Sequence, residues 1–245
     1  LLEVRAIAGD EELAARLAGT PSPVPRAQKQ KGHLAVFQGM TPNIGTTTAA
    51  FGAAVRIALY TGRRVAFVCL NLKSSKLHHY IGVDKPEGSL DGIRAELKSG
   101  ALTAQELRNR LHCPADAGGL AVLFGNLLRE QAEYYAVEDF DLLFKLCREL
   151  FDLTVIEVGA HWDNAAVFAA MLEADSRILV CADRLASFQE DYGRGVLPMM
   201  EALELARTDF DLVVRRTGAA GGYRLQDIRR QTGLNVVGAI RHHPL

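Results

Sequence analysis

Short apolar segments rich in β-branched residues alternate with amphipathic segments from residue 33 onward. The apolar segments comprise residues 34–37, 65–70, 120–124, 153–158, 177–182, 210–215 and 236–240. The amphipathic segments comprise residues 47–60, 90–98, 104–111, 137–150, 164–173, 197–207 and 225–232. Strands that are apolar along their whole length, separated by helices, are typical of parallel sheets covered on both faces. The pattern therefore predicts an α/β fold with a mostly parallel, doubly wound, seven-to-eight-stranded sheet.

The first 32 residues have a different character. Residues 10–18 are a helix candidate that Asp10 would cap. Prolines 21, 23 and 25 follow, and then Arg26, Lys29 and Lys31, a composition typical of an extended, solvated linker. We therefore expect residues 1–32 to be the end of an upstream domain plus a linker, and residues 33–245 to form the main domain.

Composition narrows the class of protein. With 245 residues, 49% of them hydrophobic, the chain can bury a sizeable core. A formal net charge of −1 argues against a general polyanion binder. No apolar run approaches the roughly 18 residues that a membrane span needs. The four cysteines are widely spaced and form no C-x-x-C pair, which favours free thiols in a reducing cytoplasm.

The loop after the first predicted strand has the setting of a phosphate-binding loop but no lysine. Residues 40–48 read Met-Thr-Pro-Asn-Ile-Gly-Thr-Thr-Thr. A working loop has the pattern G-x-x-x-x-G-K-[ST], in which backbone amides face the phosphates and the lysine bridges their oxygens. Gly45 is retained, whereas Met40 stands at the first glycine and Thr46 at the lysine. The sequence therefore predicts the frame of a nucleotide site without its charge.

Four segments, in order, resemble the ParA/MinD class of deviant-Walker P-loop ATPases. The loop at residues 40–48 is similar to the family's G-K-G-G-V-G-K-T-T, and residues 68–78 resemble its V-D-x-D-x-R-x-P-S-L-H. Residues 151–160 are similar to its Walker B segment, Y-D-x-V-I-I-D-x-x-A. The last segment, residues 211–240, looks like its base-binding strand, the next helix and the closing strand. The variant motifs are most similar to the TadZ/CpaE branch, the pole-localising proteins of Flp pilus assembly.

The resemblance implies a nucleotide site that has lost its charged groups. The family's signature lysine corresponds to Thr41, its phosphate lysine to Thr46 and its base-reading asparagine to Arg215. Its acidic pair corresponds to Cys69 and Asn71. The resemblance therefore implies no catalytic residue, and either no cofactor or weakly bound ATP or ADP with Mg²⁺. The implied cofactor-binding residues are Gly45, Thr46, Thr47, Thr48, Asn71, Glu157 and Arg215, with Thr47 and Glu157 as the metal positions.

Other interpretations of these residues stay open at this point. The threonines at 46–48 could only cap the following helix, and Glu157 could be an idle carboxylate at the end of a strand. Conversely, Arg215, Lys73 or Lys76 could replace the missing lysine in space. In that case the protein would be an active ATPase with an unconventional phosphate loop.

The carboxyl-terminal end of the chain is basic. From residue 212 onward there are six arginines and a single acid, Asp227. Such an end favours non-specific DNA binding, as in ParA-like partition proteins, although runs of charge are more often solvated surfaces. The nucleic-acid candidates under this alternative are Arg216, Arg224, Arg229, Arg230 and Arg241.

The leading functional hypothesis is an ATPase-like positioning or scaffold protein with a degenerate nucleotide site. The resemblance implies a homodimer with protein partners in Flp/Tad-type pilus or secretion-system assembly. It also implies a cytoplasmic location at the cell pole or the inner-membrane face.

Overall fold

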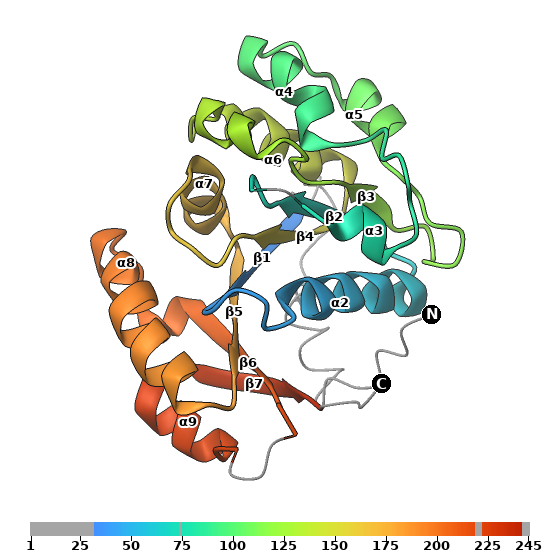
Figure 1. Ribbon diagram of the computed structural model, residues 1–245. Helices are drawn as coiled ribbons and strands as arrows, with labels where there is room; N and C mark the ends of the chain where they lie inside the picture. The colour runs from blue at the N-terminus through green and yellow to red at the C-terminus, as the bar shows by residue number, and fades with distance from the viewer. Residues whose placement is uncertain (1–31, 74, 219–221, 242–245) are drawn as a thin grey trace, which may run out of the picture.

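Seven strands form one sheet in the computed structural model, which describes residues 32–73, 75–218 and 222–241 (Figure 1). Every strand pairing in it is parallel, and the order is β3-β2-β4-β1-β5-β6-β7. The strands are β1 (His33–Gly39), β2 (Val65–Leu70), β3 (Ala121–Leu123), β4 (Leu153–Val158), β5 (Ser176–Ala182), β6 (Phe210–Arg215) and β7 (Asn235–Ile240). The predicted fold class and all seven predicted strands are confirmed.

Helices cover both faces of the sheet (Figure 1). On one face lie α2 (Thr46–Thr61) and α3 (Leu77–Tyr80), whose buried residues join one apolar cluster. The helices of the other face join a second, larger cluster. These are α4 (Leu90–Ser99), α5 (Ala104–Arg110), α6 (Asp139–Leu150), α7 (Ala165–Glu173), the π-helix η2 (Ala186–Val196), α8 (Leu197–Ala202) and α9 (Leu225–Thr232).

Strand alternation explains why two separate cores form. Successive side chains of a strand point to opposite faces of its sheet. In β1, Leu34 and Val36 therefore enter the larger cluster, whereas Ala35 and Phe37 pack under α2. All four are completely buried, as expected for a central strand with helices above and below it.

Two parts of the helix prediction are wrong. The helix predicted at 197–207 ends at Ala202, and Glu204 just beyond it has a positive φ of 56°, which a helix cannot continue through. The sequence pattern also predicts no helix over the eleven residues of η2. Their two glycines, Gly193 and Gly195, weaken the helical signal in the sequence, while burial of Phe188 and Tyr192 stabilises the helix.

The amino-terminal predictions lie outside the described residues. These are the helix at 10–18 and the linker that follows it. Gly32 is described, and its amide donates a hydrogen bond to the carbonyl of Arg148 (2.9 Å). The division of the chain at residue 32 stays a prediction.

The topology places one loop at the centre of the carboxyl edge of the sheet. Strand β1 lies between β4 and β5, so the loop that leaves it opens in the middle of that edge. The chain runs from β1 through α2 to β2 on one side, and from β4 through α7 to β5 on the other. Such a reversal of strand order creates a crevice in which open α/β sheets bind ligands.

Candidate functional site

The loop between β1 and α2 has the backbone of an anion-binding turn. It leaves β1 with the Met40 amide bonded to the carbonyl of Val180 (2.8 Å). Asn43 and Gly45 then adopt positive φ values of 61° and 89°. Gly45 is the N-cap of α2 and supplies no side chain to its first amides, and no other side chain caps them. The interpretation of the threonines at 46–48 as caps is therefore wrong, and the start of α2 keeps unpaired N–H groups that attract anions.

The three threonines point to different surroundings. The Thr46 hydroxyl lies against Gly39, where a Cβ atom would approach it to 2.5 Å, so only glycine fits at that position. The Thr47 hydroxyl donates a hydrogen bond to Glu157 of β4. Thr48 is exposed. Only Thr47 therefore reaches a charged partner inside the site.

Glu157 is buried, and no cationic side chain among the described residues pairs with it. Its side chain is 6% exposed, and one carboxyl oxygen accepts the bond from Thr47. The other lies 3.7 Å from the thiol of Cys69, which in turn lies 3.3 Å from the hydroxyl of Ser75. Burial raises the pKa of Glu157 to about 7, and the bonds from Thr47 and Cys69 only partly offset it. Burial likewise raises the pKa of the Cys69 thiol to about 12.

Arg215, at the end of β6, brings a positive charge to the loop. A Cβ atom built on Gly45 would lie 3.4 Å from Cδ and 3.5 Å from Nε of Arg215. The Arg215 side chain makes no hydrogen bond or ion pair with the residues that the structure describes. It is half-buried, so it faces the loop with its charge unmatched. Arg215 therefore lies beside the loop, and its part in binding a ligand stays a prediction.

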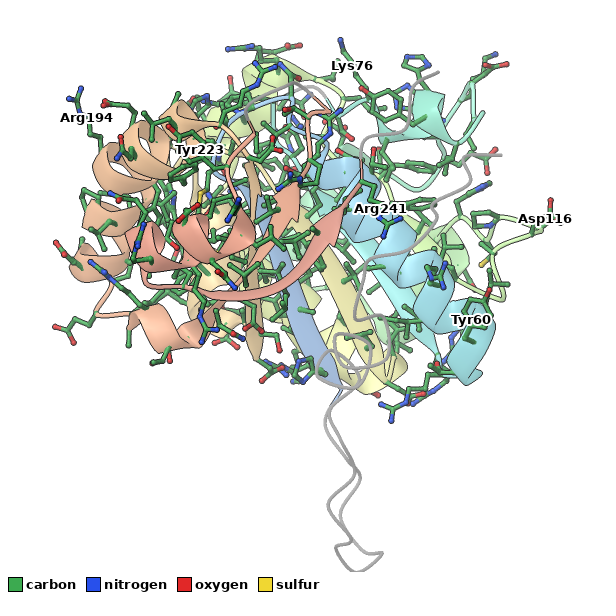
Figure 2. The ribbon with its side chains drawn as sticks, turned by 90° about the horizontal axis from the view of Figure 1, so that it is seen from below. Tyr60, Lys76, Asp116, Arg194, Tyr223 and Arg241 are labelled. Carbon is green, nitrogen blue, oxygen red and sulfur yellow. The ribbon has the colours of Figure 1, made fainter. Side chains whose placement is uncertain are left out.

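The two lysine candidates are placed less favourably. The Lys73 ammonium group lies 2.5 Å from a carboxyl oxygen of Asp163, across the carboxyl edge of the sheet. Burial raises the pKa of Asp163, but bonds from Lys73 and Asn164 outweigh it, so that pKa is lowered overall. Lys76 is exposed and its side chain is directed outward in Figure 2, although it also lines the cavity beside the loop. Asn71 is used locally, since its side-chain oxygen accepts a bond from the Lys73 amide (2.9 Å).

A cavity of about 1620 Å³ lies beside the loop, and Lys73 and Lys76 line it, whereas Arg215 does not. It extends from the loop along the outer side of α2 as far as Tyr60, which lies at the end of that helix away from the loop (Figure 2). Its volume exceeds the roughly 300–1,000 Å³ of an ordinary small-molecule pocket. Most of the predicted site residues line it, namely Gly45, Thr46, Thr47, Thr48, Asn71 and Glu157.

The oxygen atoms of this site fit Mg²⁺ only with help from a ligand. The Thr47 hydroxyl and the Glu157 carboxylate are adjacent and are the oxygen donors that Mg²⁺ prefers. No cluster of three or more His, Cys, Asp or Glu residues that could hold a metal occurs among residues 32–73, 75–218 and 222–241. Phosphate oxygens would have to complete the coordination, as they do in many Mg²⁺ sites.

The arginines of the DNA-binding alternative are partly engaged with acids. Arg216 pairs with Asp183 (3.2 Å) and Arg230 with Asp227 (3.2 Å). The others are exposed: Arg224 at the N-cap of α9, Arg229 within α9, and Arg241 after β7. None of these five lines the cavity at the loop.

Sequence reasoning missed two residues that shape the site. Ser75 is 4% exposed and holds the Cys69 thiol, while Asp183 is 2% exposed and holds the chain that follows Arg215. Asp183 comes directly after β5, and the carboxyl end of a parallel strand is where functional groups gather. That position is the signal that could have identified it.

The helices that the structure describes include none long and apolar enough to cross a membrane. No protein-family model matches the sequence. No curated protein matches it either.

Solved structures of similar fold do exist. A ParA family ATPase from Chlorobium tepidum is similar with a TM-score of 0.73 and 14% identity over 88% of this chain and 86% of its own. The MinC:MinD cell division complex of Aquifex aeolicus gives a TM-score of 0.67 and 16% identity over 87% and 83%. The septum site-determining protein MinD of Pyrococcus horikoshii, complexed with Mg-ADP, gives 0.66 and 16% over 87% and 82%. At these identities the likeness concerns the fold, and the chain has the fold of ParA/MinD-type P-loop ATPases.

Proposed function

We propose that this protein is an ATPase-like positioning or scaffold protein that does not hydrolyse nucleotide. The observation that carries the proposal is the loop itself, in which Thr46 takes the lysine position and its hydroxyl folds back against Gly39. The lysine that follows β2, Lys73, is paired with Asp163. Arg215 brings a cationic side chain against Gly45 of the loop, although it does not line the cavity.

The absence of the two lysine charges should lower the rate of hydrolysis more than the affinity for nucleotide. Each lost charge-assisted contact to phosphate is worth roughly 1.5–3 kcal/mol, so two of them weaken binding by orders of magnitude. In phosphoryl transfer, catalysis consists almost entirely of positioning and electrostatic stabilisation of the transferred group. A loop without lysine therefore loses more in rate than in binding. Mg²⁺ held by Thr47 and Glu157 would still neutralise charge on a bound phosphate.

The proposed setting is Flp/Tad-type pilus or secretion-system assembly at the cell pole. This part rests on the resemblance of the loop and of residues 68–78 to the TadZ/CpaE branch. A fluorescent fusion imaged in cells with and without the pilus genes tests it. Polar foci that depend on those genes would support it, and a uniform signal in both strains would contradict it.

Titration calorimetry with ATP and Mg²⁺, together with an assay for phosphate release, tests the non-hydrolysing function. We expect weak or no binding and no release. Thr46→Lys serves as the comparison variant, because it restores a lysine to the loop. Micromolar binding with measurable turnover by the unmodified protein would refute the proposal.

One observation favours a second candidate, an active ATPase with an unconventional loop. Arg215 lies against Gly45 and has no partner among the described residues, so it could take over the role of the missing lysine. Under this candidate, Arg215→Ala abolishes turnover, while Lys145→Ala leaves it unchanged, since Lys145 is exposed on α6 and does not line the cavity. The active ATPase would release phosphate from ATP, whereas the non-hydrolysing protein would not.

A further inference from the structure

Two consecutive arginines, Arg215 at the end of β6 and Arg216 directly after it, have different partners. Arg215 lies against Gly45 of the loop, whereas Arg216 bonds with its Nε atom to Asp183 (3.2 Å) and with Nη1 to the carbonyl of Tyr223 (2.8 Å). Adjacent side chains of an extended chain point in opposite directions. Whichever arginine is held on one side therefore leaves the other facing the loop.

Asp183 is the residue that holds Arg216. Its side chain is 2% exposed, and its two carboxyl oxygens are shared between neighbours. One accepts bonds from the amide (3.0 Å) and the hydroxyl (2.8 Å) of Thr217, and the other faces Arg216. A buried carboxylate with such a set of donors strongly favours one arrangement of the chain around it, because releasing any donor leaves charge unpaired.

The backbone of Asp183 fastens the same segment at both ends. Its amide donates to the carbonyl of Arg215 (3.2 Å), and its carbonyl accepts from the amide of Tyr223 (3.1 Å). Gly222 packs so closely that a Cβ atom there would lie 2.5 Å from the Asp183 carboxylate. Arg215 and Tyr223 are thus both fixed to Asp183, directly after β5.

We propose that Asp183 is a positioning residue that directs Arg215 at the loop and so gives the lysine-free loop a cation beside Gly45. Its carboxylate pairs with Arg216 and accepts hydrogen bonds from Thr217, and these contacts fix which arginine faces Gly45. The ligand that this arrangement favours is a compact oligophosphate, because the guanidinium group is held at the loop and at the open start of α2. This inference rests on the proposed degenerate nucleotide site but is independent of whether that site turns over.

Calorimetry with inorganic tripolyphosphate at low salt tests the proposal, with the full chain and without nucleotide. We expect Arg215→Ala to weaken binding about tenfold or more, the loss of one charge-assisted contact. Asp183→Asn should weaken it about fivefold, although it removes a negative charge and Coulomb attraction alone would strengthen it. Asp227→Asn is the matched control, since it frees Arg230 on α9 and should not weaken binding.

A double-mutant cycle separates positioning from a structural role. In an Arg215→Ala background, Asp183→Asn should have little further effect on affinity, because the two residues act on one contact. Should Asp183→Asn fold poorly, Thr217→Val removes one donor to the carboxylate and should weaken binding in the same direction. No tripolyphosphate binding by the unmodified protein would overturn the inference. Unchanged or tighter binding by the folded Asp183 variant, or additive losses in the cycle, would also overturn it.

These outcomes are distinct from failure of the proposed function. The probe carries no nucleoside, so its affinity reports the geometry of the loop alone. Turnover of ATP would refute the non-hydrolysing function and leave the role of Asp183 standing. Loss of the Asp183 effect would leave the scaffold function standing.

Discussion

At the scale of single residues, Glu157 is a carboxyl group whose ionisation is opposed by burial. Its pKa is raised to about 7 by burial, against 4.5 as the ordinary value. Between these two pH values the folded state holds a proton that the unfolded chain has released. Stability therefore falls as pH rises from about 4.5 through 7 and stays lower above that.

The first prediction is that Glu157→Gln removes this pH dependence. At pH 8 the variant should be more stable than the unmodified protein by on the order of 1–3 kcal/mol, and at pH 5 the difference should shrink toward zero. Urea unfolding in the presence of a chelator measures both. The exposed Glu173→Gln is the control and should not change the slope. A pH-independent difference for Glu157→Gln would contradict the buried, uncompensated carboxylate.

The second prediction concerns Gly45. Its φ of 89° is costly for any residue with a Cβ atom, and that atom would also meet Arg215 at 3.4 Å. Gly45→Ala should therefore destabilise the protein by about 1 kcal/mol and weaken tripolyphosphate binding. Gly195→Ala, in η2 with open space around it, is the matched control. An alanine at 45 that left both properties unchanged would show that the loop does not need its left-handed turn.

At the scale of elements, apolar pattern predicts strands better than it predicts the ends and starts of helices. All seven strands appear where predominantly apolar segments stand, because burial of both faces leaves few polar positions in β1, β2 and β4, among them Gln38, Thr154 and Glu157. The start of α2 was interpreted as threonine-capped. Thr46 instead lies against Gly39, and Thr47 bonds to Glu157. Glu157 is distant in the chain, so no local sequence pattern indicates that contact.

The contrast between two helix starts gives the third prediction. Thr103 and Glu106 form a capping box at α5, with bonds of 3.2 and 2.8 Å. Thr103→Ala should cost about 1 kcal/mol of stability and leave anion binding unchanged. Thr48→Ala, in the first turn of α2 where no side chain acts as a cap, should cost much less. Equal losses in urea unfolding would show that α2 is capped after all.

At the scale of the whole molecule, the fold follows from the alternation of strands and helices, and the site follows only in part. The sequence predicts that Gly45, Thr47, Asn71, Glu157 and Arg215 lie together, since each follows or ends a parallel strand. The direction of each side chain could not be predicted. Pairing of Lys73 with Asp163, and of Arg216 with Asp183, depends on loops whose geometry no periodicity encodes.

The fourth prediction concerns self-association. The Thr41 hydroxyl donates a hydrogen bond to Asp191 of its own chain (2.5 Å). A hydroxyl engaged in this way is not free to contact a ligand bound by a second copy. We therefore expect light scattering to give the same mass with and without Mg-ATP. Thr41→Lys is the comparison variant, and a dimer of the unmodified protein that forms only with ATP would contradict the expectation.

A loop without lysine should not support phosphoryl transfer. The test is to measure phosphate release in a single turnover, with protein in large excess over Mg-ATP. Under these conditions a low affinity does not prevent a slow chemical step from being detected. We expect no phosphate release above that of the buffer, and the same trace for Arg215→Ala. Release by the unmodified protein that disappears in Arg215→Ala would contradict the claim and establish Arg215 as a catalytic group.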